Sequence, residues 1–445
     1  MTAPARGQWS SQVGFVLAAA GSAVGLGNIW RFPYSAGENG GGAFVLVYLL
    51  CVVGLGLPVM LLEISLGRAT QKNPVGAIRA VRPRGAWPGL GYLAIITGVG
   101  ILSFYAVIAG QVLAVAVDYS QRLVTGVALF ETVGPGGILL FFVAFLLLTI
   151  LVVVGGVQRG IERWAKILMP VLLLMMVGII VRGLLLPGAV EGLRWLFMPD
   201  FSKLSLPVIL EAMAQAFFSL SLGMGAMLTY GSYLSKSQDI LRCGAWVVFF
   251  DTLIAILAGA MIFPAVFALG HEPGAGPALI FVVLPSVFSE MVGGTFLGAL
   301  FFLLLSVAAL TSTVSLLEVV SAYFIDERGW TRRRTVWTAG AITAVVGVPS
   351  ALAWVGFEPL ASTRLLGQDG FFGLMDFLWV SVSLPLGALL LCVFGTFVWG
   401  LHAASDEMAS SAPAGARLLG AWRFFVRWIC PFFIALILVT RFISV

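Results

Sequence analysis

Two clusters of small residues interrupt hydrophobic stretches of the sequence and could expose backbone atoms to a ligand. The first is Gly-Ser-Ala-Val-Gly-Leu-Gly-Asn at residues 21–28, and the second is Ser-Leu-Ser-Leu-Gly-Met-Gly at residues 219–225. Each glycine costs about 1 kcal/mol relative to alanine inside a helix, so both places favour local unwinding. Unwound amide groups favour an anion, and unwound carbonyl groups favour a cation. The alternative is close helix packing through small side chains.

Other residues that often carry chemistry are scattered. The two histidines, His271 and His402, lie far apart, and the four cysteines stand singly inside apolar stretches, at Cys51, Cys243, Cys392 and Cys430. This spacing indicates neither a metal cluster nor a nucleophile with its base. We therefore expect no enzyme and no organic cofactor.

The composition is that of a membrane protein. Of the 445 residues, 60% are hydrophobic and only 10% are charged, which contradicts a water-facing surface. The net charge of +5 could suggest an anionic partner, but basic residues in the loops between membrane spans explain it. We expect no nucleic-acid partner; the lipid bilayer is the expected surrounding.

The elements that must position the two clusters are helices. Apolar runs long enough to cross a bilayer predict an all-α polytopic protein with about eleven transmembrane helices. They lie near residues 12–35, 43–67, 89–123, 136–156, 164–186, 207–235, 243–269, 293–325, 335–355, 371–400 and 423–443. Residues 1–11 lack the layout of a cleaved signal peptide, so we expect the first run to be kept as a helix.

Basic residues predict the orientation in the cell inner (plasma) membrane. With a cytoplasmic N-terminus, the inside loops collect 17 of the 25 Lys and Arg residues, and the odd number of helices then places the C-terminus outside.

The two glycine-rich clusters occupy corresponding places, because one lies in the first helix of the first five and the other in the first helix of the second five. Broken spans in matching positions indicate a 5+5 inverted-repeat transporter with its site at the bilayer midplane. We expect one domain over residues 1–445, with repeats near 12–186 and 207–400 and an additional helix at 423–443.

Several blocks carry a family resemblance. They are residues 21–33, 38–44, 62–63, 160–166, 217–225, 293–298, 310–312 and 375–376, and they follow one another over nearly the whole chain. In these blocks the chain closely resembles the neurotransmitter:sodium symporter family, and in particular its leucine-transporter-like bacterial members.

The resemblance implies a substrate site between the two broken helices. Amides around Gly25, Leu26 and Gly27, together with the Tyr105 hydroxyl, would hold a carboxylate. The substrate side chain would contact Ile101, Phe218, Ser221, Met224, Ser312 and Leu316, which are apolar or small. Ala23 and Ser219 are also expected to contact the substrate. Amine-transporting members place an aspartate where this chain has Gly25, so an amino-acid substrate is expected. Nothing in this set would pair a charged side chain, which favours a neutral hydrophobic amino acid.

Two sodium sites are also implied, because hard cations take oxygen ligands. The first would use Ala23, Asn28, Ser219, the substrate carboxylate and Asp251, with Asp251 either a direct ligand or one shell behind, alongside Tyr48 and Gln215. The second would use carbonyls of Gly21, Val24 and Ala308 with the hydroxyls of Thr311 and Ser312. Taken alone, a Thr-Ser pair in a membrane helix usually bonds its own backbone. Taken alone, Asp251 could be a helix-start aspartate.

Many family members carry an uncharged asparagine near the first sodium and need chloride. Asp251 would supply that negative charge internally, which predicts chloride-independent transport.

The remaining expectations concern the gates and the hinge that would open and close the transporter on its two sides. The resemblance makes Arg31 and Asp376 the outer gate pair and Arg6 and Asp326 the inner pair, with Trp9 and Tyr233 nearby. Gly160 and Pro170 would let the fifth helix unwind on the cytoplasmic side, although an ordinary helix start at Gly160 is the alternative. Glu63 is expected to accept hydrogen bonds from the unwound backbone, and Glu318 has no assigned role.

These observations together predict a sodium-coupled symporter of neutral hydrophobic L-amino acids that works by alternating access. A membrane sensor that has lost transport would keep the pocket but lose the sodium ligands or gates, and a channel would need a continuous polar lining. The sequence does not indicate the oligomeric state.

Overall fold

The computed structural model describes residues 7–129, 134–274, 278–411 and 417–443, and most of these residues are helical. Among them, nine helices are long and apolar enough to cross a membrane. Five carry a single label each, namely α6 (Pro88–Thr125), α7 (Pro135–Val154), α12 (Ile240–Ala268), α14 (Gly294–Arg328) and α15 (Arg332–Trp354).

The other four long helices contain wider π-helical turns, so they are described in pieces. They are α3–η2–α4 (Gly42–Cys51, Val52–Gly56, Leu57–Thr70), η3–α8 (Val157–Glu162, Arg163–Leu184), α17–η6–α18–η7–α19 (Gly370–Asp376, Phe377–Ser383, Leu384–Phe394, Gly395–Gly400, Leu401–Ala409) and α20–η9–α21 (Leu419–Phe424, Phe425–Ile429, Cys430–Ile443).

The two remaining predicted spans are the broken ones. The first consists of α1 (Gln12–Ala23) followed by η1 (Gly27–Arg31) and α2 (Phe32–Glu38), and its two halves are bent by 52°. The sixth consists of α10 (Leu206–Ser219) and the short α11 (Ala226–Gly231). Each of the eleven predicted segments therefore has a helical counterpart, and the prediction of an all-α polytopic fold with two broken helices is confirmed.

Short elements connect the long helices, and the sequence analysis did not predict them. They are α5 (Pro74–Val81), α9 (Ala189–Phe197), η4 (Phe201–Lys203), η5 (Leu279–Val283), α13 (Leu284–Glu290), α16 (Glu358–Ala361) and the antiparallel strands β1 (Arg364–Leu365) and β2 (Gln368–Asp369).

Polar side chains determine several helix starts. The Ser11 hydroxyl accepts the Gly14 amide at 3.0 Å, which starts α1 where the sequence predicts it. The Asp239 carboxylate likewise accepts the Arg242 amide at 3.0 Å. That cap starts α12 at Ile240, three residues before the predicted start at Cys243.

The tenth helix is longer than predicted. We expected it to end near residue 400 and expected residues 405–417 to form a loop, but α19 continues to Ala409. Alanine favours helix, and the Ser405 hydroxyl donates to the Leu401 carbonyl one turn earlier at 2.8 Å, so it does not compete with the helix.

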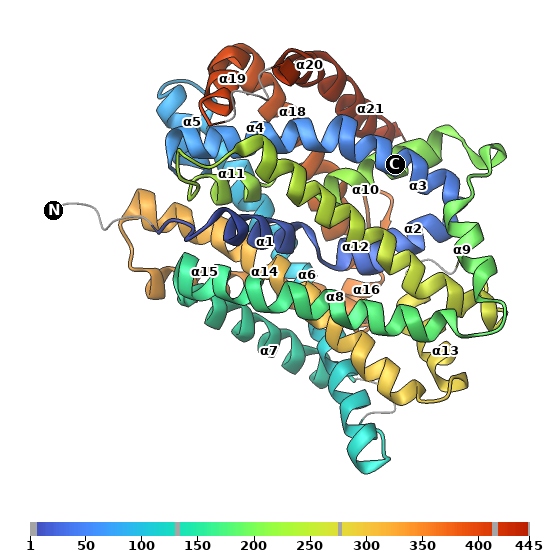
Figure 1. Cartoon of the computed structure of the whole chain (residues 1–445). Coiled ribbons are helices and arrows are strands. Elements are labelled where there is room, and N and C mark those ends of the chain that lie inside the picture. Colours follow the sequence, from blue (N-terminus) through green and yellow to red (C-terminus); the bar gives the residue numbers. More distant parts are fainter. Residues whose placement is uncertain (1–6, 130–133, 275–277, 412–416, 444–445) are drawn as a thin grey trace.

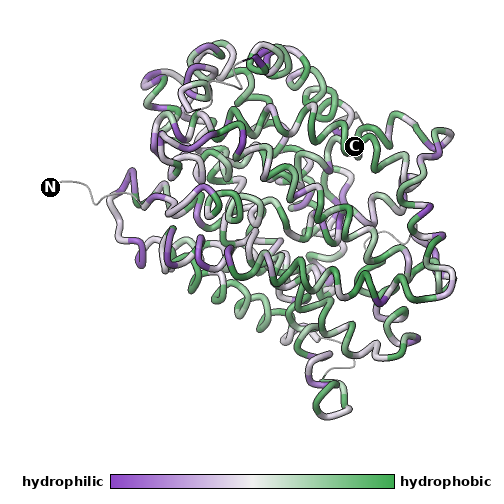
Figure 2. Tube along the Cα trace, in the orientation of Figure 1, coloured by the Kyte–Doolittle hydropathy of each residue, from purple (hydrophilic) through white to green (hydrophobic). Residues whose placement is uncertain are grey.

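The long helices lie side by side across the molecule (Figure 1), and α14 packs along α6 and α1. Hydrophobic residues cover the helix flanks, and hydrophilic residues gather toward the two ends of the bundle (Figure 2). This distribution suits helices whose flanks face lipid and whose ends face water.

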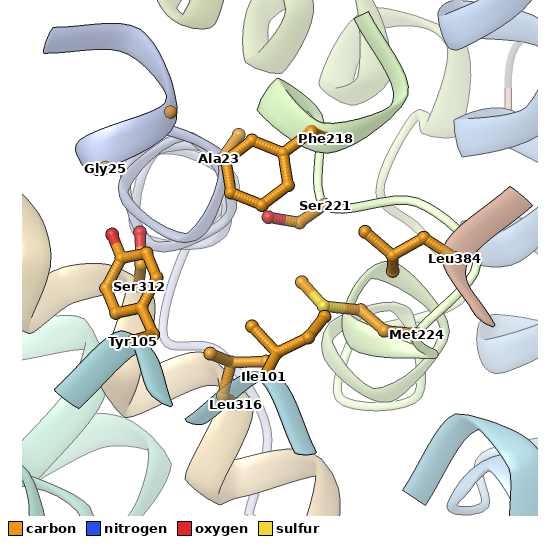
Figure 3. Close-up of a pocket in the computed structure, with 11 residues that line it drawn as sticks. Ala23, Gly25, Ile101, Tyr105, Phe218, Ser221, Met224, Ser312, Leu316 and Leu384 are labelled. Atoms are coloured by element: carbon orange, nitrogen blue, oxygen red, sulfur yellow. The ribbon is translucent and has the colours of Figure 1, made fainter. Parts of the chain in front are cut away.

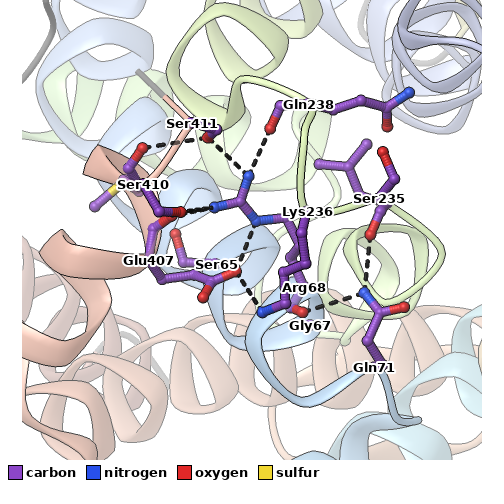
Figure 4. A network of polar contacts seen from close by, with 12 residues as sticks. Ser65, Gly67, Arg68, Gln71, Ser235, Lys236, Gln238, Glu407, Ser410 and Ser411 are labelled. Carbon is purple, nitrogen blue, oxygen red and sulfur yellow. Dashed lines mark hydrogen bonds and ion pairs between the residues drawn. The ribbon is translucent and has the colours of Figure 1, made fainter. Parts of the chain in front are cut away.

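A buried arginine joins three separate segments at one end of the bundle (Figure 4). Arg68, at the end of α4, is fully buried, and its Nε lies 2.7 Å from Glu407 Oε1 on α19. It also donates to the Gln238 carbonyl and, at 2.8 Å, to the Ser411 hydroxyl. Lys236 adds a second ion pair to Glu407 at 2.8 Å. The ends of α4 and α19 are thereby tied to the segment between α11 and α12.

Candidate functional site

The two helix breaks are held open by close backbone contacts. In the sixth segment, Gly223 and Gly225 have φ of +83° and +73°, which glycine adopts without strain. A Cβ at Gly223 would overlap the Leu384 carbonyl oxygen of the tenth helix, so no larger residue fits there without movement. Ser221 also has a positive φ, of 54°, and its hydroxyl donates to the Ser22 carbonyl of the first break at 3.1 Å. One break is therefore hydrogen-bonded directly to the other.

Glu63 supports the sixth break from the second helix. Its carboxylate accepts the amides of Gly223 at 2.7 Å and of Leu228 at 3.3 Å. The prediction that Glu63 accepts bonds from the unwound backbone is confirmed, because unwinding left these amides without a helical partner.

A cavity of about 360 Å³ lies where the two breaks meet. Figure 3 shows its side chains pointing toward one central space. Ten of the predicted substrate-binding residues line it, namely Ala23, Gly25, Gly27, Ile101, Tyr105, Phe218, Ser221, Met224, Ser312 and Leu316. Two others do not line it: Leu26 and Ser219 point their polar groups into neighbouring hydrogen bonds.

One lining residue, Leu384, was missed by the sequence analysis. It lies at the first residue of α18, next to Pro385, in the tenth helix. The resemblance blocks 21–33, 217–225 and 310–312 did not reach it, and a leucine among many leucines gives no signal of its own.

The polar end of the cavity is formed by the first break. The Tyr105 hydroxyl accepts the Leu26 amide at 2.8 Å, and the Asn28 side-chain oxygen accepts the Gly25 amide at 3.2 Å. A Cβ at Gly25 would overlap the Ser312 and Tyr105 hydroxyls, so an aspartate at this position would require both to move. This end of the cavity thus offers backbone amides and hydroxyls without a fixed charge.

Asn28 and Ser219, both predicted for the first sodium, come together with Tyr48 around Asp251. Asn28 donates to Asp251 Oδ1 at 2.7 Å and to the Ser219 hydroxyl at 2.9 Å. Ser219 donates to Asp251 Oδ2 at 2.8 Å, and the Tyr48 hydroxyl lies 3.4 Å from the same oxygen. Gln215 lies nearby and donates to the Gly27 carbonyl at 2.7 Å.

Asp251 is fully buried well inside α12, whose N-cap is Asp239. The helix-start interpretation of Asp251 is therefore wrong. Its hydrogen-bond partners are neutral, and within the described part of the chain no Lys or Arg pairs with it. A buried carboxylate among neutral oxygen-bearing groups suits a small hard cation, so these residues fit sodium.

The residues predicted for the second sodium also lie together. The Thr311 hydroxyl lies 3.2 Å from the Val24 carbonyl and 2.8 Å from the Ala308 carbonyl, and the Ser312 hydroxyl lies 3.2 Å from Val24. A Cβ at Gly21 would meet Thr311 Cβ at 3.4 Å, so these segments approach closely. Thr311 thus bonds its own helix, as the alternative interpretation expects, and also reaches the first break. This oxygen set fits sodium as well.

Comparisons with known proteins agree with this architecture. The family model described as the sodium:neurotransmitter symporter family matches residues 6–127 and 114–445. The chain belongs to the sodium:neurotransmitter symporter family. It is therefore a sodium-dependent multi-pass membrane symporter and not an enzyme.

Related proteins match this chain over nearly its whole length. The uncharacterized sodium-dependent transporter YhdH of Bacillus subtilis is 39% identical over 97% of this chain and 96% of its own length. An uncharacterized sodium-dependent transporter of Haemophilus influenzae is 32% identical over 98% of each chain. The crystal structure of MhsT in complex with L-phenylalanine superposes with a TM-score of 0.88 at 42% identity, covering 98% of this chain and 100% of MhsT.

The two residues predicted for the outer gate are not paired with each other. Arg31 and Asp376 are both described, yet they do not lie within ion-pair distance of each other. Arg31 Nη2 instead lies 3.5 Å from Glu211 Oε1 on α10. Asp376 is the last residue of α17 and lies inside the tenth helix, which begins at Gly370. Glu211 was missed, although a carboxylate within an apolar helix is itself a signal of function.

The residues predicted for the inner gate make the following contacts. Arg6 lies outside the described residues, and Asp326 accepts the Asn73 amide at 3.0 Å. Trp9 donates from its ring nitrogen to the Tyr230 carbonyl at 2.9 Å, and its ring lies 6.1 Å from that of Tyr233. The closeness of Trp9 and Tyr233 is confirmed.

Glu318, which had no assigned role, is the centre of a buried ion pair. It accepts the Tyr233 hydroxyl at 2.7 Å and lies 2.6 Å from Arg332 Nη2. The Arg332 Nε also donates to the Val153 carbonyl at 2.8 Å, so the end of α7 and the start of α15 are joined at this point.

The proposed hinge residues lie in one continuous helix. Gly160 is in η3, and Pro170 lies inside α8. The helix begins at Val157, so Gly160 lies in its first turn rather than at its first residue. A Cβ at Gly160 would overlap the Val152 carbonyl oxygen of α7, so close packing explains the glycine.

Proposed function

We propose that this symporter couples sodium entry to the uptake of neutral hydrophobic L-amino acids by alternating access. The observation that carries the proposal is the cavity between the two broken helices. It has an apolar wall and an end of amide and hydroxyl groups, and two oxygen-rich clusters flank it.

The cavity wall supports the choice of substrate. Ile101, Phe218, Met224, Leu316 and Leu384 would surround an apolar side chain. Because none of them carries a charge, a charged substrate side chain would be left unpaired there. The similarity to MhsT, whose structure holds L-phenylalanine, points to the same class of substrate.

The polar end would bind the common part of an amino acid. Amides around Gly25, Leu26 and Gly27, with the Tyr105 hydroxyl, would hold the carboxylate. The closeness of Ser312 and Tyr105 to Gly25 leaves no room for the aspartate that an amine substrate would need.

Two sodium ions would bind in the two clusters. The first would take Ala23, Asn28, Ser219 and Asp251 with the substrate carboxylate, and the second would take Gly21, Val24, Ala308, Thr311 and Ser312. Since the substrate carboxylate would complete the first shell, binding of substrate and of sodium would be mutually cooperative. Asp251 would balance the added positive charge, so transport would not need chloride.

The repeats would be residues 12–186 and 207–400 of a single domain, with the last helix added. The N-terminus would lie in the cytoplasm and the C-terminus outside the inner membrane, because the basic residues then gather on the inside. Arg31 and Asp376 would close the outer side, and Arg6, Trp9, Tyr233 and Asp326 the inner side. Unwinding between Gly160 and Pro170 would admit water to the second sodium.

The test is uptake of the twenty amino acids in proteoliposomes with and without an inward sodium gradient. We expect accumulation of hydrophobic amino acids only with the gradient. Replacing sodium by potassium or choline should lower the binding affinity sharply. Uptake that ignores the gradient, or a preference for charged amino acids, would refute the proposal.

A further inference from the structure

Four charged side chains from four different helices gather beside the substrate cavity. They are Arg31 on η1, Glu211 on α10, Asp376 on α17 and Arg441 on α21. A second cavity of about 280 Å³ is lined by both arginines and shares Phe218 and Leu384 with the substrate cavity. The two arginines therefore lie next to the substrate cavity.

Glu211 forms ion pairs of different length with the two arginines. Glu211 Oε2 lies 2.8 Å from Arg441 Nη2, whereas Glu211 Oε1 lies 3.5 Å from Arg31 Nη2. Within the described residues, Asp376 forms no ion pair, yet it lies in electrostatic range of Arg31, Arg441 and Glu211. Glu211 thus holds the arginine of the last helix tightly and the gate arginine loosely.

Arg31 is incompletely hydrogen-bonded in its present position. Its guanidinium carbon lies 4.9 Å above the centre of the Phe218 ring, which forms part of the substrate cavity. Its Nε is buried without a hydrogen-bond partner. A buried, incompletely satisfied donor gains by moving to a second acceptor.

We propose that Arg441, on the C-terminal helix, is a positioning residue of the outer gate. It keeps Glu211 paired, so that Arg31 is free to leave Glu211 and pair with Asp376 when the cavity closes. This inference rests on the proposed function, since it assumes a cycle in which a bound substrate becomes enclosed.

The reason is the penalty for an unpaired buried charge. The Glu211 side chain is only 22% exposed, so its charge would be poorly solvated after Arg31 departed. With Arg441 present, Glu211 keeps a cation in both states. Without Arg441, Glu211 would compete with Asp376 for Arg31 and hold the gate in its present pairing.

Closure can be followed at Ser381, which lines the second cavity. A Ser381→Cys variant would be labelled in membranes with a membrane-impermeant thiol reagent, and the rate would be compared with and without sodium and L-phenylalanine. The described native cysteines are buried, so the chain without Ser381→Cys gives the background. Equilibrium binding of L-phenylalanine is measured in parallel.

In this background, Arg441→Gln should largely remove the protection against labelling and lower kcat by about fivefold, within the usual range of coupling between contacting residues. Arg441→Lys should keep protection and kcat. The double variant Arg441→Gln with Glu211→Gln should recover both, because the competing carboxylate is gone. A merely structural Arg441 would not be rescued by a second substitution.

Two results would overturn the inference, namely protection and kcat unchanged by Arg441→Gln, or a double variant no better than the single one. If the chain without Ser381→Cys binds no neutral hydrophobic amino acid with sodium, the proposed substrate class is wrong, which is a separate result. The labelling comparison is then made with the amino acid that the uptake test identifies.

Discussion

Asp251 is the side chain whose surroundings say most about ion coupling. Asn28 and Ser219 donate to its two oxygens, and the network contains no cation among the described residues. Burying a lone carboxylate is unfavourable, and the sodium ion proposed for this place would supply the missing positive charge.

Replacing Asp251 by Asn should make transport sensitive to chloride. We expect wild-type uptake to be equal in chloride and in gluconate, because the carboxylate already balances the sodium charge. The Asp251→Asn variant should lose activity, or recover part of it only in chloride. The measurement is initial uptake into proteoliposomes in the two salts.

Asp239→Asn is the matched control, since it removes a carboxylate from the N-cap of the same helix. It should leave the salt response unchanged. A wild type that itself needs chloride would show that Asp251 does not replace the anion.

Thr311 tests the second sodium site. Thr311→Ala removes a hydroxyl that lies 3.2 Å from the Val24 carbonyl, and we expect the sodium concentration for half-maximal uptake to rise about tenfold. The preference among hydrophobic amino acids should change little, because Thr311 does not line the substrate cavity.

Thr313→Ala provides the comparison on the same helix, because its hydroxyl bonds Leu310 and Thr149 away from the break. Equal sodium dependence in the Thr311→Ala and Thr313→Ala variants would argue against a cation at this place.

At the scale of elements, the fifth helix combines a tightly packed start with a proline in its interior. Pro170 cannot donate a helical hydrogen bond, which weakens the turn before it. Gly160 lies against α7, so packing as well as helical hydrogen bonds holds the first turns. The proposed unwinding would therefore have to break both this packing and the turn that Pro170 weakens.

Pro170→Ala should keep substrate binding and slow turnover. Restoring one backbone hydrogen bond stabilises the closed helix by about 1 kcal/mol, which corresponds to about a fivefold lower kcat if unwinding limits release. Binding is measured by scintillation proximity, and turnover by sodium-driven uptake.

The interior proline of α15, Pro349, gives a control for the general effect of removing a proline. Pro349→Ala should leave turnover near wild type. Undiminished turnover in Pro170→Ala would count against unwinding of the fifth helix.

At the scale of the whole molecule, buried polar networks fasten the ends of neighbouring helices to one another. Arg68 joins α4 to α19, and the Glu318–Arg332 pair joins α14 to α15. Because these groups are buried, losing one partner would strand a charge in a low-dielectric environment.

Arg68→Gln should therefore lower the free energy of unfolding by about 3–5 kcal/mol. Lys236→Gln removes an exposed partner of the same carboxylate and should change it by less than about 1 kcal/mol. Thermal unfolding of both variants in detergent measures the difference. Comparable losses in the two variants would show that burial of Arg68 is not what matters.

Most of the fold could be predicted from the sequence. Helices in a bilayer satisfy their own backbone hydrogen bonds, so an apolar run of sufficient length predicts a span without knowledge of its neighbours. The two glycine-rich breaks could also be predicted from their own segments, because glycine weakens a helix in any surroundings. The end of the tenth helix was misplaced, because Ser405 and its alanines are compatible with either loop or helix until packing selects one.

Some residues of the candidate site could be predicted from the sequence, and others could not. Asn28, Ser219, Thr311 and Ser312 lie in recognisable motifs, and they were named before their distances were known. Leu384, Glu211 and Arg441 were not, because each becomes important only through a neighbour from another helix. Local backbone preference and hydrophobicity are properties of a segment, so the sequence by itself determined the spans and their breaks. An ion pair depends on which helices meet, so only the tertiary structure decided that Arg31 and Arg441 share Glu211.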